Sequence, residues 1–348
     1  MTQNKMSADQ IRKALKAGII TDEQANTMLA EGGASSNTAP TAALIGQEDD
    51  MRFLRSFSDV FIGIGLIILM LGASGLAALM GGRVSYLMAA GGAAILANYF
   101  GRVKRAHFPT LILALAFLLF VQRGLISILG GSGTLAALIT AGAMSLFYWR
   151  IRLPFCIALI ALALLYLLFS ALGAIAPDFT KSSFGWVLLG AGLAVFSAAL
   201  AYDTRDTQRL TRFADNAFWL HFIAAPMIIH GLAIMTLSLK ADVLFGFVPM
   251  VSLQRTDAAL LLGVVAIITL IGLAINRRAL IVSSFGYAAF ALIYLFDGSG
   301  MKLGMSITSA LLALGGAIVF LGVGWHASRN QLIKLLPKWK IFPPPFED

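Results

Sequence analysis

The sequence predicts an all-α fold, a polytopic transmembrane bundle of about ten helices, and three observations carry that prediction. First, 59% of the 348 residues are hydrophobic and only 12% are charged, whereas a soluble domain carries about 25% charged residues. Second, apolar runs of roughly 20 residues recur, and a helix of that length crosses about 30 Å of hydrocarbon. Third, the connections between these runs alternate between rich and poor in Lys and Arg. Because lipid offers the backbone no hydrogen bonds, each run is expected to be helical.

Residues 1–33 are predicted to form a cytoplasmic helical hairpin. Each of its two helices has capping-box spacing at its start and a glycine near its end: Ser7 with Gln10 and then Gly18, followed by Thr21 with Gln24 and then Gly32. Such a pair is too small to bury a sizeable core alone. Two alternatives therefore stay open, in which it docks on this protein's own cytoplasmic face or on a protein partner. Residues 34–56 follow as a flexible linker that leads into the membrane.

The predicted membrane domain covers residues 57–325. It consists of apolar runs with basic residues in the short loops beside them, which is how a membrane protein sets its orientation. The ten helices are expected at 57–80, 84–100, 107–122, 132–149, 153–176, 184–202, 216–239, 257–275, 279–296 and 303–325.

The distribution of Lys and Arg predicts which way the helices run. With the N-terminus inside, 20 of the 26 basic residues fall on the cytoplasmic side, as the positive-inside bias requires. Each connection between spans on that side holds at least two of them: Arg102, Lys104 and Arg105; Arg150 and Arg152; Arg205, Arg209 and Arg212; Arg277 and Arg278. Both termini are therefore predicted to be cytoplasmic. Because this pattern accounts for the net charge of +9, no nucleic-acid partner is expected.

Residues 326–348 are expected to form a cytoplasmic interfacial tail. Apolar and basic side chains alternate there, which suits a short helix on an anionic leaflet, ended by proline. They are Leu332, Ile333, Leu335, Leu336 and Trp339 beside Lys334, Lys338 and Lys340.

Small residues indicate where helices approach one another closely. Gly190, Ala194 and Ala198 are spaced four apart on the sixth predicted span. Because lipid gives helices no hydrophobic reason to associate, such a stripe is typical of a packing face.

The seventh span, FADNAFWLHFIAAPMIIHGLAIMTL, combines an apolar run with polar residues. Asn216, Trp219 and His230 fall within a narrow arc of the helix. Pro226 removes the hydrogen bond to the carbonyl of Phe222, and backbone freed in a membrane must be buried in protein or line a wet cavity. Asn216, Trp219, Pro226 and His230 are therefore the candidate cavity-lining residues.

The two histidines of this span are nine residues apart and point to opposite sides of the helix. They cannot hold one metal ion without ligands from other spans, so no metal site is predicted. Counted from Asn216, His221 lies about 7 Å into the membrane and His230 about 21 Å. Two interpretations of His230 stay open: it lines a cavity as a hydrogen-bonding or protonatable group, or it is neutral and bonded to a serine, threonine or carbonyl of a neighbouring helix.

The connection before the seventh span places Arg205, Arg209 and Arg212 at helical spacing on one face, with Asp203 and Asp206 nearby. These arginines are the candidate headgroup-binding residues, because clustered cations attract anionic lipid or phosphate. The alternative is a solvated face with internal salt bridges.

Motifs of enzyme chemistry are absent from the sequence. There is no G-x-x-x-x-G-K-[ST], H-E-x-x-H, C-x-x-C or G-x-S-x-G, and no predicted span holds paired carboxylates facing a common interior. The single cysteine, Cys156, excludes an intrachain disulfide and a cysteine metal cluster. No enzymatic activity and no cofactor are therefore expected.

Two stretches resemble known bacterial membrane proteins. DNAFWLHFIAAPMIIH (215–230) resembles a signature of multi-spanning inner-membrane proteins of Gram-negative bacteria, and KALKAGIITDEQANTML (13–29) looks like the leading segment of a bacterial membrane family of the domain-of-unknown-function type. The resemblance implies a helical bundle in the inner membrane. It implies no activity, so no residue role is carried over.

The function expected from these features is that of a transporter, or of a small-molecule or lipid-binding membrane protein, with a cavity lined by the seventh span. Its expected partner is the bilayer, including anionic lipid. The alternative is a membrane scaffold or sensor that recruits protein partners through residues 1–33. Ten spans exceed what an anchor needs, which favours transport or binding.

Overall fold

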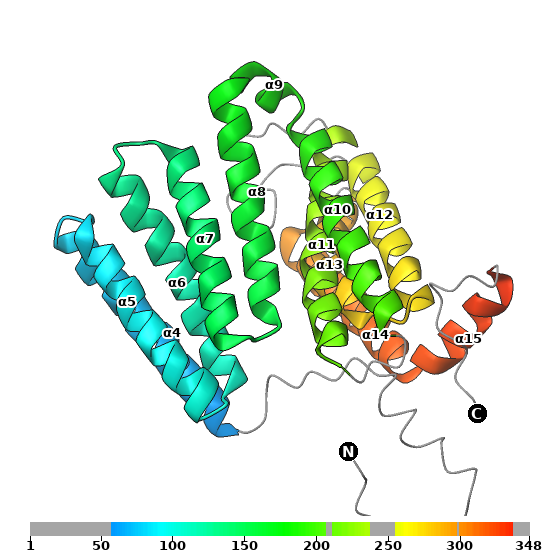
Figure 1. The fold of residues 1–348 in the computed structure, drawn as a ribbon. Helices are drawn as coiled ribbons and strands as arrows, with labels where there is room; N and C mark the ends of the chain where they lie inside the picture. The colour runs from blue at the N-terminus through cyan, green and yellow to red at the C-terminus, as the bar shows by residue number, and fades with distance from the viewer. Residues whose placement is uncertain (1–56, 207–210, 237–254, 298, 337–348) are drawn as a thin grey trace, which may run out of the picture. The chain divides into compact units, whose positions relative to one another are not determined.

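The computed structural model describes residues 57–206, 211–236, 255–297 and 299–336. Within these ranges the chain is all-helical and contains no strand, and ten of its helices are long and apolar enough to cross a membrane (Figure 1). The predicted fold class is confirmed. The predicted hairpin (1–33), the linker (34–56), Arg209 and the tail beyond residue 336 lie outside the described residues.

The observed helices follow the predicted runs to within a few residues at most ends. The spanning helices are α4 (Phe57–Leu79), α5 (Val84–Asn98), α6 (His107–Ile128), α7 (Gly133–Ile151), α8 (Phe155–Ile175), α10 (Phe184–Arg205), α11 (Arg212–Thr236), α12 (Arg255–Ala274), α13 (Arg278–Asp297) and α14 (Leu303–Val323). Three shorter elements join them: the π-helical turn Tyr99–Val103 after α5, α9 (Pro177–Ser182) and α15 (Trp325–Leu335).

Helix α6 differs most from its predicted range, since it continues to Ile128 instead of stopping at residue 122. Its extension carries Arg123, whose guanidinium carbon lies 5.7 Å from the ring centroid of Tyr86 on α5. A cation over an aromatic face is stabilised by the ring quadrupole. The charge is therefore accommodated without breaking the helix.

Two hydrophobic clusters pack the helices, one centred on α5 to α8 and one on α11 to α13. Helix α11 takes part in both, because Trp219 packs on the first cluster and Ile229 lies in the second. It is also the most enclosed of the ten spans: 61% of an 18-residue apolar stretch of this helix is buried, against 11% of the corresponding stretch of α14. The span with the most polar residues is thus the one best shielded from lipid.

Helices α10 and α11 approach closely through glycines, but not through the predicted stripe. Gly190, Ala194 and Ala198 are exposed, and a Cβ added at Gly190 would meet nothing within 4 Å. The contact is made instead by Gly192 and Gly231, where an added Cβ would lie 3.0 Å from the backbone nitrogen of Ile228 and 2.7 Å from that of Leu189. The predicted stripe is not used within this chain, because four-residue spacing identifies a face but not which face meets a neighbour.

The beginning of α15 is docked on the bundle. Trp325 and Arg329 are buried, the indole N–H of Trp325 donates to the side-chain oxygen of Asn276 at 2.9 Å, and Arg278 lies 5.1 Å from the Trp325 ring. The opposite face and the end of this helix are exposed, including His326, Ala327 and Leu335.

Spans joined by short connections run antiparallel, so their ends alternate. The turns that follow α5, α7 and α10 therefore share one end of the membrane domain. The turn after α12 lies at the same end, because its Arg277 contacts Asp203 near the end of α10. We call this the arginine-rich end. It carries Arg102, Arg150, Arg152, Arg205, Arg212 and Arg277, and it holds the candidate site.

Candidate functional site

The turn between α7 and α8 fixes the position of Arg152. Helix α7 ends at Ile151, and Arg152 adopts a left-handed backbone with φ 56°, while its N–H donates to the carbonyl of Tyr148 at 2.7 Å. Pro154 lies two residues further on, immediately before α8 begins at Phe155, and its fixed φ suits a helix start. A residue at a closed helix C-terminus has little backbone freedom, so the Arg152 side chain leaves the bundle from a defined point.

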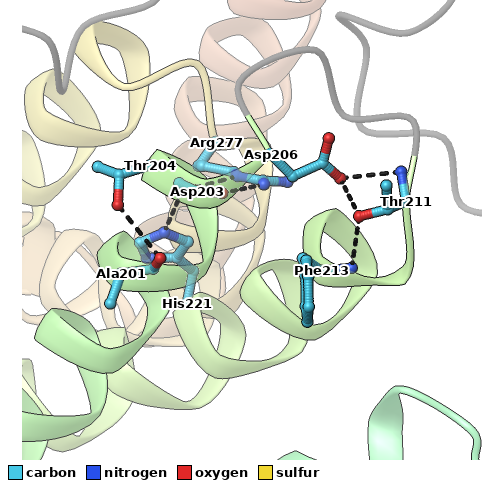
Figure 2. Close-up of polar contacts among 8 residues, drawn as sticks. All are labelled: Ala201, Asp203, Thr204, Asp206, Thr211, Phe213, His221 and Arg277. Atoms are coloured by element: carbon cyan, nitrogen blue, oxygen red, sulfur yellow. Dashed lines mark hydrogen bonds and ion pairs between the residues drawn. The ribbon is translucent and has the colours of Figure 1, made fainter.

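The start of α11 is fixed by a second set of local bonds (Figure 2). The Asp206 carboxylate accepts from the Thr211 N–H at 2.8 Å and from the Thr211 hydroxyl at 2.6 Å. The Thr211 hydroxyl oxygen in turn accepts from the Phe213 N–H at 3.2 Å, a capping interaction typical of helix N-termini. Arg212 is thereby held as the first residue of α11.

This break corrects the prediction that Arg205 and Arg212 share one helical face. Helix α10 ends at Arg205 and a new helix begins at Arg212, so the two arginines belong to different helices. The bonds between Asp206 and Thr211 stabilise the interruption, which helical spacing alone does not reveal. Arg205 is exposed and lines neither of the cavities described next.

Two adjoining cavities lie where these turns meet, and together we call them the arginine groove. The first, about 420 Å³, is lined by Arg102, Trp149, Arg150, Ile151, Arg152 and Arg212. The second, about 500 Å³, is lined by Tyr148, Trp149, Arg152, Thr211, Arg212, Phe213 and Asn216. They share Trp149, Arg152 and Arg212, so the groove is continuous. Three segments far apart in sequence build it: the turn after α5, the end of α7 and the start of α11.

The groove concentrates positive charge that no described residue neutralises. Four guanidinium groups line it, from Arg102, Arg150, Arg152 and Arg212. Within the part of the chain that the structure describes, none of the four side chains forms a hydrogen bond or an ion pair. Like charges gathered in one concavity raise the local potential and attract an anion. A guanidinium also presents paired N–H donors that match a phosphate or carboxylate.

The nearby acidic residue Asp203 is bound elsewhere, in a buried charge cluster (Figure 2). The Asp203 carboxylate on α10 lies between Arg277, which precedes α13, and His221 on α11. It accepts from Arg277 Nε at 3.2 Å and forms a second, short contact with Arg277 Nη2. His221 Nε2 lies 2.9 Å from the same carboxylate. Arg277 and His221 are fully enclosed, with 1% and 0% exposure, so the cluster ties the end of α10 to the middle part of α11 and to the turn between α12 and α13.

Sequence reasoning missed this cluster and most of the groove. His221 was placed at the interface and Asp203 among solvated salt bridges, whereas the structure buries His221 against Asp203. Arg102, Arg150, Arg152 and Arg277 were counted only as orientation signals. Their loop positions were visible in the sequence, but not which loops lie next to one another.

The predicted cavity-lining residues of α11 separate according to depth. Asn216 is buried and lines the second cavity of the groove. Trp219, one turn further, packs instead against Phe155 of α8, with ring centroids 6.0 Å apart. Neither Pro226 nor His230 lines the arginine groove.

His230 and Pro226 meet through Tyr287 of α13. The Tyr287 hydroxyl donates to the carbonyl of Pro226 at 3.4 Å, and His230 Nδ1 lies 3.1 Å from the hydroxyl oxygen. The polar contact thus uses the proline's own carbonyl, one turn beyond that of Phe222. The other ring nitrogen, Nε2, is buried and has no hydrogen-bond partner among the described residues. His230 is bonded to a neighbouring helix, as one interpretation expected, but the partner is a tyrosine.

The described residues contain no group of three or more His, Cys, Asp or Glu side chains placed to hold a metal ion. Comparisons of the chain with protein-family models, with curated proteins and with solved structures give no match. The function must therefore be argued from the site itself. The arrangement in hand, cations beside aromatic rings at the end of membrane-spanning helices, is suited to binding an anion.

Proposed function

We propose that this chain is a multi-pass membrane protein that binds an anionic small molecule or lipid in the arginine groove. The resemblance of residues 215–230 to bacterial inner-membrane proteins supports an inner-membrane location. The clustering of basic residues at one end supports a cytoplasmic position for the groove. The proposal therefore includes an inner-membrane location and a cytoplasmic groove.

One observation carries it: four arginines from three segments line a single groove and have no ion pair within the described ranges. An isolated surface arginine is common and is solvated. Converging arginines repel one another, at roughly 1 kcal/mol per pair at 4 Å even in water. The arrangement is stabilised once an anion occupies the groove.

The test is native mass spectrometry of the full-length protein purified in an uncharged detergent. The wild type is expected to carry a reproducible anionic ligand, and the Arg152→Gln/Arg212→Gln variant to lose it, because these two arginines belong to both cavities. Arg205→Gln is the matched control, since Arg205 lies at the same end but outside the groove. Equal ligand occupancy in all three proteins would contradict the proposal.

A second candidate, transport of the bound anion, is favoured by the polar pair deeper in α11. A buried His230 ring nitrogen with no described partner is costly in a membrane interior, where polar side chains often mark a transport path. In proteoliposomes, His230→Ala should abolish flux of the ligand identified above while its binding persists. Flux at the wild-type rate in this variant would show that His230 has no role in transport.

A further inference from the structure

We infer that the ligand of the arginine groove is an anionic phospholipid, bound through its phosphate with its apolar part along the neighbouring aromatic side chains. This inference rests on the proposed function and names the class of ligand. Three observations support it: the different lining of the two cavities, the order of the lining residues along the helices, and the exposed aromatic rings beside the arginines.

The groove is divided into a cationic half and an aromatic half. All four arginines line the first cavity, together with Trp149 and Ile151. The second cavity shares Arg152, Arg212 and Trp149 with the first and adds Tyr148, Thr211, Phe213 and Asn216. A free inorganic anion bound by the arginines would leave the added aromatic side chains uncovered. A molecule with a phosphate at one end and a hydrocarbon chain at the other matches both.

The two halves are ordered along the helix axis as a lipid would be. Tyr148 and Trp149 lie in the last turn of α7, and Arg152 follows its end. Arg212 begins α11, and Asn216 lies one turn inside it. Tyr148, Trp149 and Asn216 therefore lie toward the spans, and Arg152 and Arg212 lie at their ends, in the way aromatic belts and basic residues meet lipid headgroups.

The aromatic half presents a large apolar surface beside the charges. Trp149 is 66% exposed and Phe213 is 43% exposed. Burial of such rings is favourable in proportion to the apolar area covered, and an acyl chain leaving a bound phosphate would cover them. Arginine is suited to the phosphate end because its planar donors bind two oxygens at once.

Nearby carboxylates do not occupy the groove. Asp203 is bound to Arg277 and His221, and Asp206 is bound to Thr211. Among the described residues, no acidic side chain lines either cavity. The phosphate thus meets arginines without a competing carboxylate from that part of the chain.

The experiment measures thermal stability of the full-length protein in an uncharged detergent while one of three compounds is titrated: phosphatidylglycerol, phosphatidylcholine or inorganic phosphate. Phosphatidylglycerol is expected to stabilise the wild type at concentrations at least about tenfold below those needed for phosphatidylcholine, since each arginine near an anionic surface contributes a severalfold gain. Raising the salt concentration should weaken this effect.

Three variants locate the effect. Arg152→Gln/Arg212→Gln should raise the phosphatidylglycerol concentration required by about tenfold or more, while Arg205→Gln should leave it unchanged. Trp149→Ala should weaken the response to phosphatidylglycerol without changing any response to phosphate. Because this variant retains every arginine, it still tests the inference if the double variant fails to fold.

The outcomes separate this inference from the proposed function. Stabilisation by phosphate equal to that by phosphatidylglycerol, both lost in the double variant, would keep the anion-binding groove and overturn the lipid assignment. An equal response to the two lipids, or a phosphatidylglycerol response unchanged in the double variant and in Trp149→Ala, would also overturn the lipid assignment. A wild type that responds to no anion and carries none in its native mass spectrum would overturn both.

Discussion

The Asp203 carboxylate illustrates how this protein tolerates charge inside a membrane domain. It neutralises Arg277 and contacts His221, and both of these partners are almost fully buried. Burying ions is costly, and such a cluster is stabilising only while every member keeps its partner. The cluster therefore joins α10, α11 and the α12–α13 turn through one carboxylate.

Asp203→Asn should destabilise the protein by about 3 kcal/mol, the scale for leaving a buried charge uncompensated. Thermal unfolding in detergent measures the change. Asp178→Asn is the control, because Asp178 is exposed on the short helix α9 and should have little effect. If the two substitutions lower stability equally, the buried cluster does not have the role assigned to it.

Tyr287→Phe removes the hydroxyl that contacts both His230 and the Pro226 carbonyl. The expected loss is about 1 kcal/mol, since interhelical hydrogen bonds in membranes average somewhat less than this per bond. Tyr294→Phe on the same helix provides the comparison, because Tyr294 packs against the ring of Phe290. A Tyr287→Phe protein as stable as the Tyr294→Phe protein would show that the bonded pair contributes nothing.

At this scale the sequence predicted which residues are unusual but not their partners. Asn216 and His230 were recognised because they are polar within an apolar run. Asp203, Arg277 and Tyr287 were not, because their bonds join residues 74 and 57 positions apart. Such pairings depend on which helices become neighbours, and residue spacing contains no information on that.

Among the elements, the pair α10 and α11 shows how small residues set helix distance. Gly185 and Leu189 of α10 meet Gly231 of α11, so the two backbones pass without side chains between them. Close approach of this kind lets van der Waals packing hold helices together in lipid.

Gly231→Ala should therefore lower stability by about 1–3 kcal/mol, the usual cost of overpacking. Its Cβ would lie 2.7 Å from the backbone nitrogen of Leu189, and backbone cannot move aside as a side chain can. Gly190→Ala is the matched control on α10, with nothing within 4 Å of the added atom. Thermal unfolding of both variants makes the comparison, and equal stability would contradict the packing described.

The helices themselves were predictable because hydrocarbon thickness dictates their length and composition. Their ends were less so. Helix α6 keeps Arg123 by placing it over Tyr86, and the segment after Arg205 breaks because Asp206 and Thr211 bond to each other. Both effects are local interactions that override the average preference of a charged or polar residue for a loop.

For the whole molecule, the ten spans follow from composition, while the orientation stays a prediction from the Lys and Arg distribution. Recruitment of partners through residues 1–33 also stays a prediction, since it depends on a segment outside the described residues. The arginine groove could not be foreseen, because its lining comes from three connections whose adjacency arises only when the helices assemble.

Cysteine labelling tests the orientation of the protein in bacterial expression cells whose outer membrane is permeabilised while the inner membrane stays intact. In a Cys156→Ala background, Ser182→Cys on α9 should react with a membrane-impermeant maleimide, and Lys104→Cys at the arginine-rich end should react only after lysis. Both positions are exposed, so access depends on the side of the membrane. Labelling of Lys104→Cys in intact cells would reverse the predicted orientation and place the groove outside.

The most direct test of the central claim is a density map of the full-length protein in phosphatidylglycerol-containing nanodiscs. Phosphate density is expected within hydrogen-bond distance of Arg152 and Arg212, with acyl-chain density continuing along Trp149 and Phe213. A well-resolved groove without such density, or with its arginines paired to the protein's own carboxylates, would contradict the claim that this protein binds an anionic ligand there.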